Sequence, residues 1–123
     1  MRMLIIDDSS TMRRFLGVIA KELAIETEQA ADGQEALERL ERGSDFDVAL
    51  VDWDMPRMNG LEFIQAVRTR PEFEGLKLMM LTSHNSIQDV RVALASGAND
   101  YLMKPVTQEM IAEKLTLLGL LSA

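Results

Sequence analysis

The chain has 123 residues, of which 47% are hydrophobic, so it can form one globular domain with a buried core. It contains no cysteine, which excludes disulfide bonds, thiolate catalysis and cysteine-based zinc sites. The 13 basic and 20 acidic residues give a net charge of −7 with no evident basic face, which argues against direct binding of nucleic acid. No apolar run reaches the about 18 residues of a membrane span, and the first residues do not form a secretory signal. We therefore expect a soluble cytoplasmic protein.

The first elements read as a buried strand, an amphipathic helix and a polar strand. Residues 3–6 are a continuous apolar run, which is typical of a strand buried on both faces. Apolar side chains then recur at steps of three and four over residues 12–23, which predicts a helix with Ser9 or Ser10 at its N-cap. Residues 26–30 are polar, so we expect that strand at an edge of the sheet.

The middle of the chain repeats the alternation. A helix is expected over residues 33–42, ended by Gly43 as a C-cap. A second buried strand follows over residues 46–51. Apolar residues within 61–67 mark the next helix, and Pro71 stops it.

The last third adds two strands and two helices. Residues 76–81 predict a third apolar strand, residues 87–94 a helix and residues 101–103 a short strand, and Thr107 caps a final helix over residues 111–118. Five strands that alternate with five helices indicate an α/β fold, with a parallel sheet covered by helices on both faces. We expect residues 1–123 to form one such domain.

Polar residues end the apolar strands and the last short strand. They are Asp7 and Asp8, Asp52, Thr82, and Lys104. The carboxyl ends of parallel strands share one edge of the sheet, where this class of fold binds ligands. We therefore expect these side chains to form one site.

Three carboxylates gathered at one edge repel each other unless a cation lies among them. Mg²⁺ prefers oxygen ligands of this kind and shares phosphate oxygens with a substrate. Asp52 can act as a nucleophile toward phosphorus. Taken singly, Asp7 and Asp8 could instead favour the start of the first helix through its dipole, and Asp52 could begin a turn.

The lysine and the threonine also have two interpretations each. Lys104 can pair with Asp52 or with a phosphoryl oxygen, or it can be an exposed loop residue. Thr82 can donate a hydrogen bond to a phosphoryl group, or it can cap the next helix. Because an X-Pro bond can be cis, we expect a cis bond between Lys104 and Pro105 that aims the lysine back over the strand ends.

Four motifs together resemble a known family, the response-regulator receiver domains. They are DDSSTMRR at residues 7–14, DWDMPRMNG at 52–60, TS at 82–83 and YLMKP at 101–105. The resemblance covers the whole chain and is closest to stand-alone chemotaxis regulators of the CheY type. It implies a five-stranded sheet in the order 2-1-3-4-5.

The resemblance also implies a role for each matching acid. Asp52 would be the phosphoacceptor. Asp7, Asp8 and Asp52 would bind Mg²⁺, with the backbone carbonyl of Asp54 as a further ligand. The phosphodonor would be a histidine kinase or its phosphotransfer domain, and the phosphate would be lost by hydrolysis. The chain would thus be a signalling domain that assists its own chemistry, not an enzyme.

The remaining matches concern the switch. Thr82 would be the switch hydroxyl, Lys104 would pair with the phosphoryl group, and Tyr101 would turn inward when Thr82 moves. The output partner would bind the surface of helix 4, strand 5 and helix 5, with the flagellar motor switch as one candidate, and the protein would be a monomer or a weak dimer.

Three positions depart from the chemotaxis pattern. Asp54 adds a carboxylate two residues after Asp52, and His84 lies two residues after Thr82; family members tune dephosphorylation at these positions. Ile87 stands where chemotaxis regulators usually have lysine, which weakens the case for the motor switch.

The last helix carries two apolar lines. Ile111, Leu115 and Leu118 are expected to face the core, and the second line comprises Met110, Leu117 and Leu121. The second line would either widen the buried face or form a contact with a partner or a second copy.

Three alternatives remain open from the sequence. Asp52 and Asp54 also resemble the Asp-x-Asp motif of haloacid-dehalogenase-type phosphatases, although a complete βα unit precedes the motif here. A flavodoxin-like module is conceivable, but Asp7 and Asp8 would repel a flavin phosphate. The chain could also be the receiver of a longer regulator.

Overall fold

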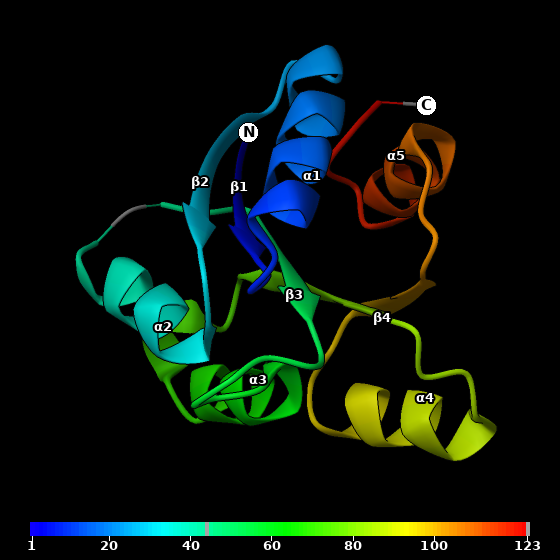
Figure 1. Ribbon diagram of the computed structural model, residues 1–123. Coiled ribbons are helices and arrows are strands. Elements are labelled where there is room, and N and C mark those ends of the chain that lie inside the picture. Colours follow the sequence, from blue (N-terminus) through cyan, green and yellow to red (C-terminus); the bar gives the residue numbers. More distant parts are fainter. Residues whose placement is uncertain (44, 123) are drawn as a thin grey trace.

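The computed structural model describes residues 1–43 and 45–122 as an alternation of strands and helices (Figure 1). The strands are β1 (Arg2–Ile6), β2 (Glu26–Ala30), β3 (Val48–Asp52), β4 (Lys77–Thr82) and β5 (Asp100–Met103). The helices are α1 (Ser10–Glu22), α2 (Gly33–Glu41), α3 (Gly60–Arg68), α4 (Ile87–Ala95) and α5 (Gln108–Leu117), with a 3-10 turn at Pro71–Phe73. The strands pair in parallel in the order β2-β1-β3-β4-β5, which confirms the expected α/β fold.

Helices cover both faces of the sheet, with α1 and α5 on one side and α2, α3 and α4 on the other (Figure 1). Successive strand residues supply the two cores alternately, because side chains along a strand point to opposite faces. Leu4 and Ile6 pack toward α2 and α3, whereas Met3 and Ile5 pack toward α1 and α5. Both faces are therefore buried, which explains the continuous apolar runs of β1, β3 and β4. Among the described helices, none has the length and apolar character needed to cross a membrane.

Most of the expected start and stop signals operate as predicted. Ser9 is the N-cap of α1, and its side chain accepts a hydrogen bond from the Met12 N–H at 3.1 Å. Thr107 caps α5 in the same way through the Met110 N–H. Gly43 lies just beyond α2 with φ +83°, a conformation that favours glycine. The polar strand β2 lies at the edge of the sheet, as expected.

The boundaries of β3 and β4 differ from the sequence expectation, and the difference matters for the site. β3 begins at Val48, not Phe46, and ends at Asp52, while β4 ends at Thr82. The ladder includes Asp52 opposite Leu81, so these polar residues are the last members of their strands. Their backbones are therefore held by the sheet, which fixes the direction of their side chains.

Helix periodicity overestimated burial at several apolar positions. Phe15 is 44% exposed although it belongs to the apolar pattern of α1, and α4 buries Ala93 while Ile87 is 70% and Leu94 46% exposed. In α5 the first apolar line packs on the core as expected, but in the second line only Leu117 is exposed, at 69%. Periodicity shows that a helix forms but does not show how wide a face the neighbouring elements cover.

Candidate functional site

The acidic site lies where β1 and β3 end side by side. In the parallel ladder Ile6 pairs with Val51, so Asp7 and Asp52 come next at the same edge. Asp7 and Asp52 are buried, with 1% and 5% exposure, whereas Asp8 is exposed. One carboxylate oxygen from each of the three acids lies within 4.8 Å of the other two. This cluster could hold a metal ion, as the sequence predicted.

One oxygen of Asp7 shows that the cluster suits a cation. Asp7 Oδ1 accepts a hydrogen bond from the Ser9 N–H at 2.9 Å. Asp7 Oδ2 is buried and has no hydrogen-bond partner among the described residues. Leaving a buried charged acceptor unsatisfied costs more than a lost neutral hydrogen bond. A divalent ion bound by Asp7, Asp8 and Asp52 would satisfy this oxygen.

Lys104 enters the site from β5. Its Nζ donates to Asp52 Oδ1 at 3.1 Å and lies 3.7 Å from Asp7 Oδ2. The Lys104–Pro105 bond is cis, which is the expected geometry. Burial alone would lower the pKa of Lys104, but the carboxylates of Asp52 and Asp7 outweigh burial and raise that pKa. Lys104 is therefore a permanent cation beside the acids.

Asp52 differs from an ordinary carboxylate in its protonation. Burial raises its pKa from the ordinary value of 3.8 to about 6, and the charges of Asp7 and Asp8 act in the same direction. The hydrogen bond and charge of Lys104 lower the pKa but do not cancel the effect of burial. At neutral pH Asp52 is therefore mostly ionised but more basic than an exposed aspartate, and basicity favours a nucleophile.

Thr82 and Tyr101 meet at the segment that follows β4. Thr82 is fully buried, and its Oγ1 accepts a hydrogen bond from the His84 N–H at 2.9 Å. The Tyr101 hydroxyl donates to the carbonyl oxygen of the same residue, His84. Burial raises the pKa of Tyr101, and the charges of Asp89 and Asp54 raise it further. The two predicted switch residues thus share one loop residue as a partner.

The geometry and the sequence agree with one known family. Residues 3–116 match the model of the response regulator receiver domain. The chain belongs to the response-regulator receiver family.

The similarity of this receiver to known proteins extends over nearly all of its length. It is 39% identical over 116 residues to the chemotaxis protein CheY1 of Helicobacter pylori, covering 94% of each chain. It superimposes on the chemotaxis protein CheY4 of Vibrio cholerae with a TM-score of 0.88 and 34% identity, covering 94% of this chain and 96% of that one.

Longer proteins also contain a similar domain. A probable two-component response regulator/GGDEF domain protein matches with a TM-score of 0.89 and 25% identity, covering 98% of this chain and 50% of that one. The receiver is thus similar both to stand-alone regulators and to one part of a longer regulator. With the family shown, the haloacid-dehalogenase and flavodoxin alternatives are not retained.

An aromatic cluster beside the receiver's acids is a feature to which the sequence pointed only weakly. Trp53 is buried, and its ring stacks on His84 with parallel planes and centroids 4.4 Å apart. His84 Nε2 lies 3.0 Å from both oxygens of Asp54, and Nδ1 lies 3.5 Å from Asp89 Oδ2. The hydrogen bond to Asp54 raises the pKa of His84 despite its partial burial. Two of the three residues that depart from the chemotaxis pattern, Asp54 and His84, are therefore partners.

The loop between β3 and α3 carries Asp54 and is held in place at two points. A Cβ at Gly60 would lie 2.3 Å from the carbonyl oxygen of Asp52, so a larger residue would push the loop off β3. Arg57 has φ +64° and pairs with the buried Asp32 at the start of α2. These restraints position the loop. The role of the Asp54 carbonyl as a metal ligand stays a prediction.

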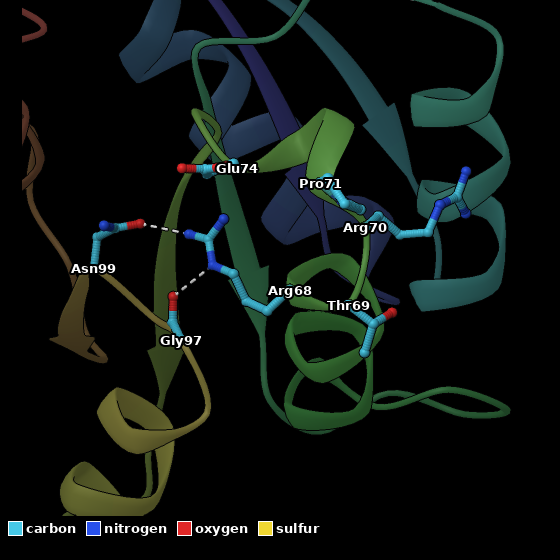
Figure 2. Close-up of a pocket in the computed structure, with 7 residues that line it drawn as sticks. All are labelled: Arg68, Thr69, Arg70, Pro71, Glu74, Gly97 and Asn99. Carbon is cyan, nitrogen blue, oxygen red and sulfur yellow. Dashed lines mark hydrogen bonds between the residues drawn. The ribbon is translucent and has the colours of Figure 1, made fainter.

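A hollow lies at the opposite edge of the sheet. It has a volume of about 480 Å³ and lies near the start of β4 and β5, between the end of α3 and the segment before β5 (Figure 2). Arg68 dominates it, with Nε donating to the Gly97 carbonyl at 3.0 Å and Nη2 to Asn99 Oδ1 at 2.8 Å. These bonds join two elements, and the hollow is remote from the acids. The carboxyl edge therefore remains the candidate functional site.

Proposed function

We propose that this receiver takes a phosphoryl group from a histidine kinase or phosphotransfer domain onto Asp52 and thereby controls a partner protein. The observation that carries the proposal is the buried Asp52 carboxylate, which is paired with Lys104 Nζ at 3.1 Å and lies beside Asp7 and Asp8. The proposed acceptor Asp52, the cation Lys104 and the carboxylates that could bind a metal thus lie together. We also propose that residues 1–123 act as one receiver domain in the cytoplasm.

The chemistry assigned to the residues is a single displacement. An ionised oxygen of Asp52 forms a bond to phosphorus as the bond between phosphorus and the donor breaks, which gives an acyl phosphate. Lys104 neutralises charge on the transferred oxygens. Asp7, Asp8, Asp52 and the Asp54 carbonyl would hold Mg²⁺, which when bound supplies further charge neutralisation for the phosphoryl oxygens. Hydrolysis of the acyl phosphate returns the carboxylate.

The proposed output follows from the contacts of Thr82. A phosphoryl group on Asp52 adds acceptor oxygens that Thr82 Oγ1 and Lys104 Nζ can approach. If Thr82 moves, its bond with the His84 N–H changes, and so does the loop that holds the Tyr101 hydroxyl. Exposed apolar side chains lie on the elements beyond this loop; they are Ile87 and Leu94 on α4, Met103 on β5 and Leu117 on α5.

The proposed partner therefore binds the α4–β5–α5 surface, and the receiver itself is a monomer or a weak dimer. The similar CheY proteins are named as chemotaxis proteins, which makes the flagellar motor switch a candidate partner. Chemotaxis regulators usually have lysine where this chain has Ile87. We therefore propose that the partner makes an apolar contact, and not a charged one, at the start of α4.

Incubation with acetyl phosphate and Mg²⁺, followed by measurement of the intact mass, tests the proposal. We expect the mass of one phosphoryl group to be added to the wild type, and none to Asp52→Asn or after chelation of Mg²⁺. The matched control Asp54→Asn should still be modified. Modification that persists in Asp52→Asn would remove the assignment. Turnover of an unrelated phosphate ester that is lost in Asp54→Asn would instead favour phosphatase chemistry.

A further inference from the structure

A groove of about 450 Å³ lies between α1 and the edge strand β2. Its lining includes the cations Arg13, Arg14 and Lys21, and no acidic residue among those described lines it. The chain as a whole has a net charge of −7, so this concentration of positive charge runs against the composition. Arg14 and Lys21 are exposed, and neither has an ion pair within the described residues. Their charges are therefore available to a ligand.

The acids of β2 do not neutralise the groove. Side chains along a strand alternate between the two faces of the sheet. Thr27 and Gln29 line the groove, whereas Glu26 and Glu28 are both paired with Arg2. Because β2 is the edge strand, no further strand of the sheet covers the outer side of Thr27 and Gln29. Gln29 Nε2 donates to the Arg13 carbonyl at 3.4 Å, which leaves Gln29 Oε1 and the Thr27 hydroxyl as the polar groups beside the two cations.

The spacing of the cations limits the ligand. Arg14 and Lys21 are seven residues apart on α1, which corresponds to about 10 Å along the helix axis. One phosphate or carboxylate group cannot contact both. In an extended peptide, side chains at positions i and i+4 point to the same face and are about 13 Å apart, a span that the long side chains of Arg14 and Lys21 can reach. The cations therefore match an extended chain with spaced acids better than a single small anion.

The surface between the cations also suits a chain. Gly17 lies between Arg14 and Lys21 and has no side chain, so α1 itself does not fill the space between the two cations. The Gln29 side chain borders this space, because a Cβ at position 17 would lie 3.3 Å from Gln29 Nε2. Val18 is 53% exposed and lines the same groove, where it can contact an apolar side chain between the two acids.

We propose that the α1–β2 groove binds an extended acidic segment of a partner protein. Arg14 and Lys21 pair with two carboxylates about 13 Å apart, Val18 contacts the apolar side chain midway between them, and Thr27 and Gln29 hydrogen-bond to the segment's backbone. This interaction does not require phosphorylation of Asp52 and uses a surface separate from the α4–β5–α5 surface.

Fluorescence anisotropy with two labelled hexapeptides tests the proposal. The probe carries two aspartates four positions apart with a valine midway between them, and the control has the same composition with adjacent aspartates. We expect saturable binding of the probe that weakens between low salt and about 150 mM salt, because screening shortens the reach of exposed charges. The double variant Arg14→Glu/Lys21→Glu should weaken binding about tenfold or more. The matched variant Arg42→Glu/Arg91→Glu changes net charge equally at exposed cations elsewhere and should bind as wild type does.

Amide shifts in ¹⁵N spectra should locate the probe at Gly17, Val18 and Thr27. Should either double variant lose its folded circular dichroism spectrum, the corresponding glutamine substitutions replace it. Equal affinity for the adjacent-aspartate peptide, or equal loss in Arg42→Glu/Arg91→Glu, would overturn the proposal as nonspecific attraction. Displacement of the probe by stoichiometric pyrophosphate would overturn it in favour of a small-anion site. Binding of phosphatidylglycerol vesicles without binding of the probe would overturn it in favour of a membrane contact.

Discussion

At the scale of single residues, the ionised form of Asp52 makes the folded state less stable. The pKa of Asp52 is raised to about 6 in the folded protein, above its ordinary value of 3.8. Protonated Asp52 therefore favours folding below pH 3.8, and this contribution is lost as the pH rises through about 6. The loss amounts to at most about 3 kcal/mol at neutral pH. The carboxylate of Asp52 is thus retained at a cost in stability.

Replacement of Asp52 by asparagine should consequently stabilise the protein. We expect Asp52→Asn to raise the free energy of unfolding at pH 7.5 by about 1–3 kcal/mol without Mg²⁺, because the buried charge is gone. The gain should shrink toward zero as the pH falls below 4, where wild-type Asp52 is also neutral. Urea unfolding at several pH values measures the effect. Equal stability of the two proteins at pH 7.5 would mean that burial does not raise this pKa.

Trp53 provides a direct measure of metal binding, because it follows Asp52 in the chain and is buried. We expect Mg²⁺ to change its emission with a saturable titration curve. Asp8→Ala should weaken the apparent affinity about tenfold or more, since one of three carboxylates is lost. The control Glu109→Ala removes an acid at the start of α5 and should leave the curve unchanged. An unaltered curve in Asp8→Ala would remove Asp8 from the metal site.

The sequence revealed the charged members of the site better than its aromatic members. Asp7, Asp52 and Lys104 could be brought together in advance because each follows or ends a strand of a parallel sheet. The stacking of His84 on Trp53 could not be predicted, because it joins two loops whose relative position depends on the whole fold. A lone histidine has many surface roles, so nothing in its local sequence indicated the partner Asp54.

At the scale of elements, Arg68 fastens the edge of the sheet that is remote from the acids. Besides Gly97 and Asn99, its guanidinium donates to the carbonyls of Phe73 and Leu76 at 3.2 and 2.8 Å. These bonds connect α3, the 3-10 turn and the segments before β4 and β5. All four acceptors are neutral, and burial lowers the pKa of Arg68. Sequence periodicity placed α3 correctly but could not show that its last residue acts as a connection.

Loss of these bonds should destabilise the fold without altering the acidic site. We expect Arg68→Ala to lower the free energy of unfolding by about 2–3 kcal/mol, because several partly buried carbonyls lose their donor. Arg68→Lys should recover only part of this loss, since an ammonium group cannot match the planar fork of donors. Arg91→Ala, an exposed arginine on α4, serves as the control. Stability of Arg68→Ala within about 0.5 kcal/mol of the control would show that water replaces the guanidinium.

At the scale of the whole molecule, one short path joins the acids to the proposed output surface. Thr82 ends β4 beside Asp52 in the sheet. Its hydroxyl accepts a hydrogen bond from the His84 N–H, and the His84 carbonyl accepts one from the Tyr101 hydroxyl on β5. Moving a two-state equilibrium from 1:99 to 99:1 requires about 5.5 kcal/mol of preference. A few charge-assisted hydrogen bonds can supply this amount, so the loss of one of them should weaken the response substantially.

Thr82→Ala should therefore separate phosphorylation from its effect on the output surface. The acceptor, Lys104 and the acids remain, so acetyl phosphate with Mg²⁺ should still add one phosphoryl group, measured by intact mass. In ¹⁵N spectra, modification of the wild type should shift amide signals on α4 and β5. These shifts should be much smaller in Thr82→Ala, because the variant lacks the hydroxyl that links the phosphoryl oxygens to the His84 loop. Thr82→Ser keeps the hydroxyl and should retain the shifts. Full-sized shifts in Thr82→Ala would show that the signal leaves the site by another route, with Lys104 and β5 as the remaining connection.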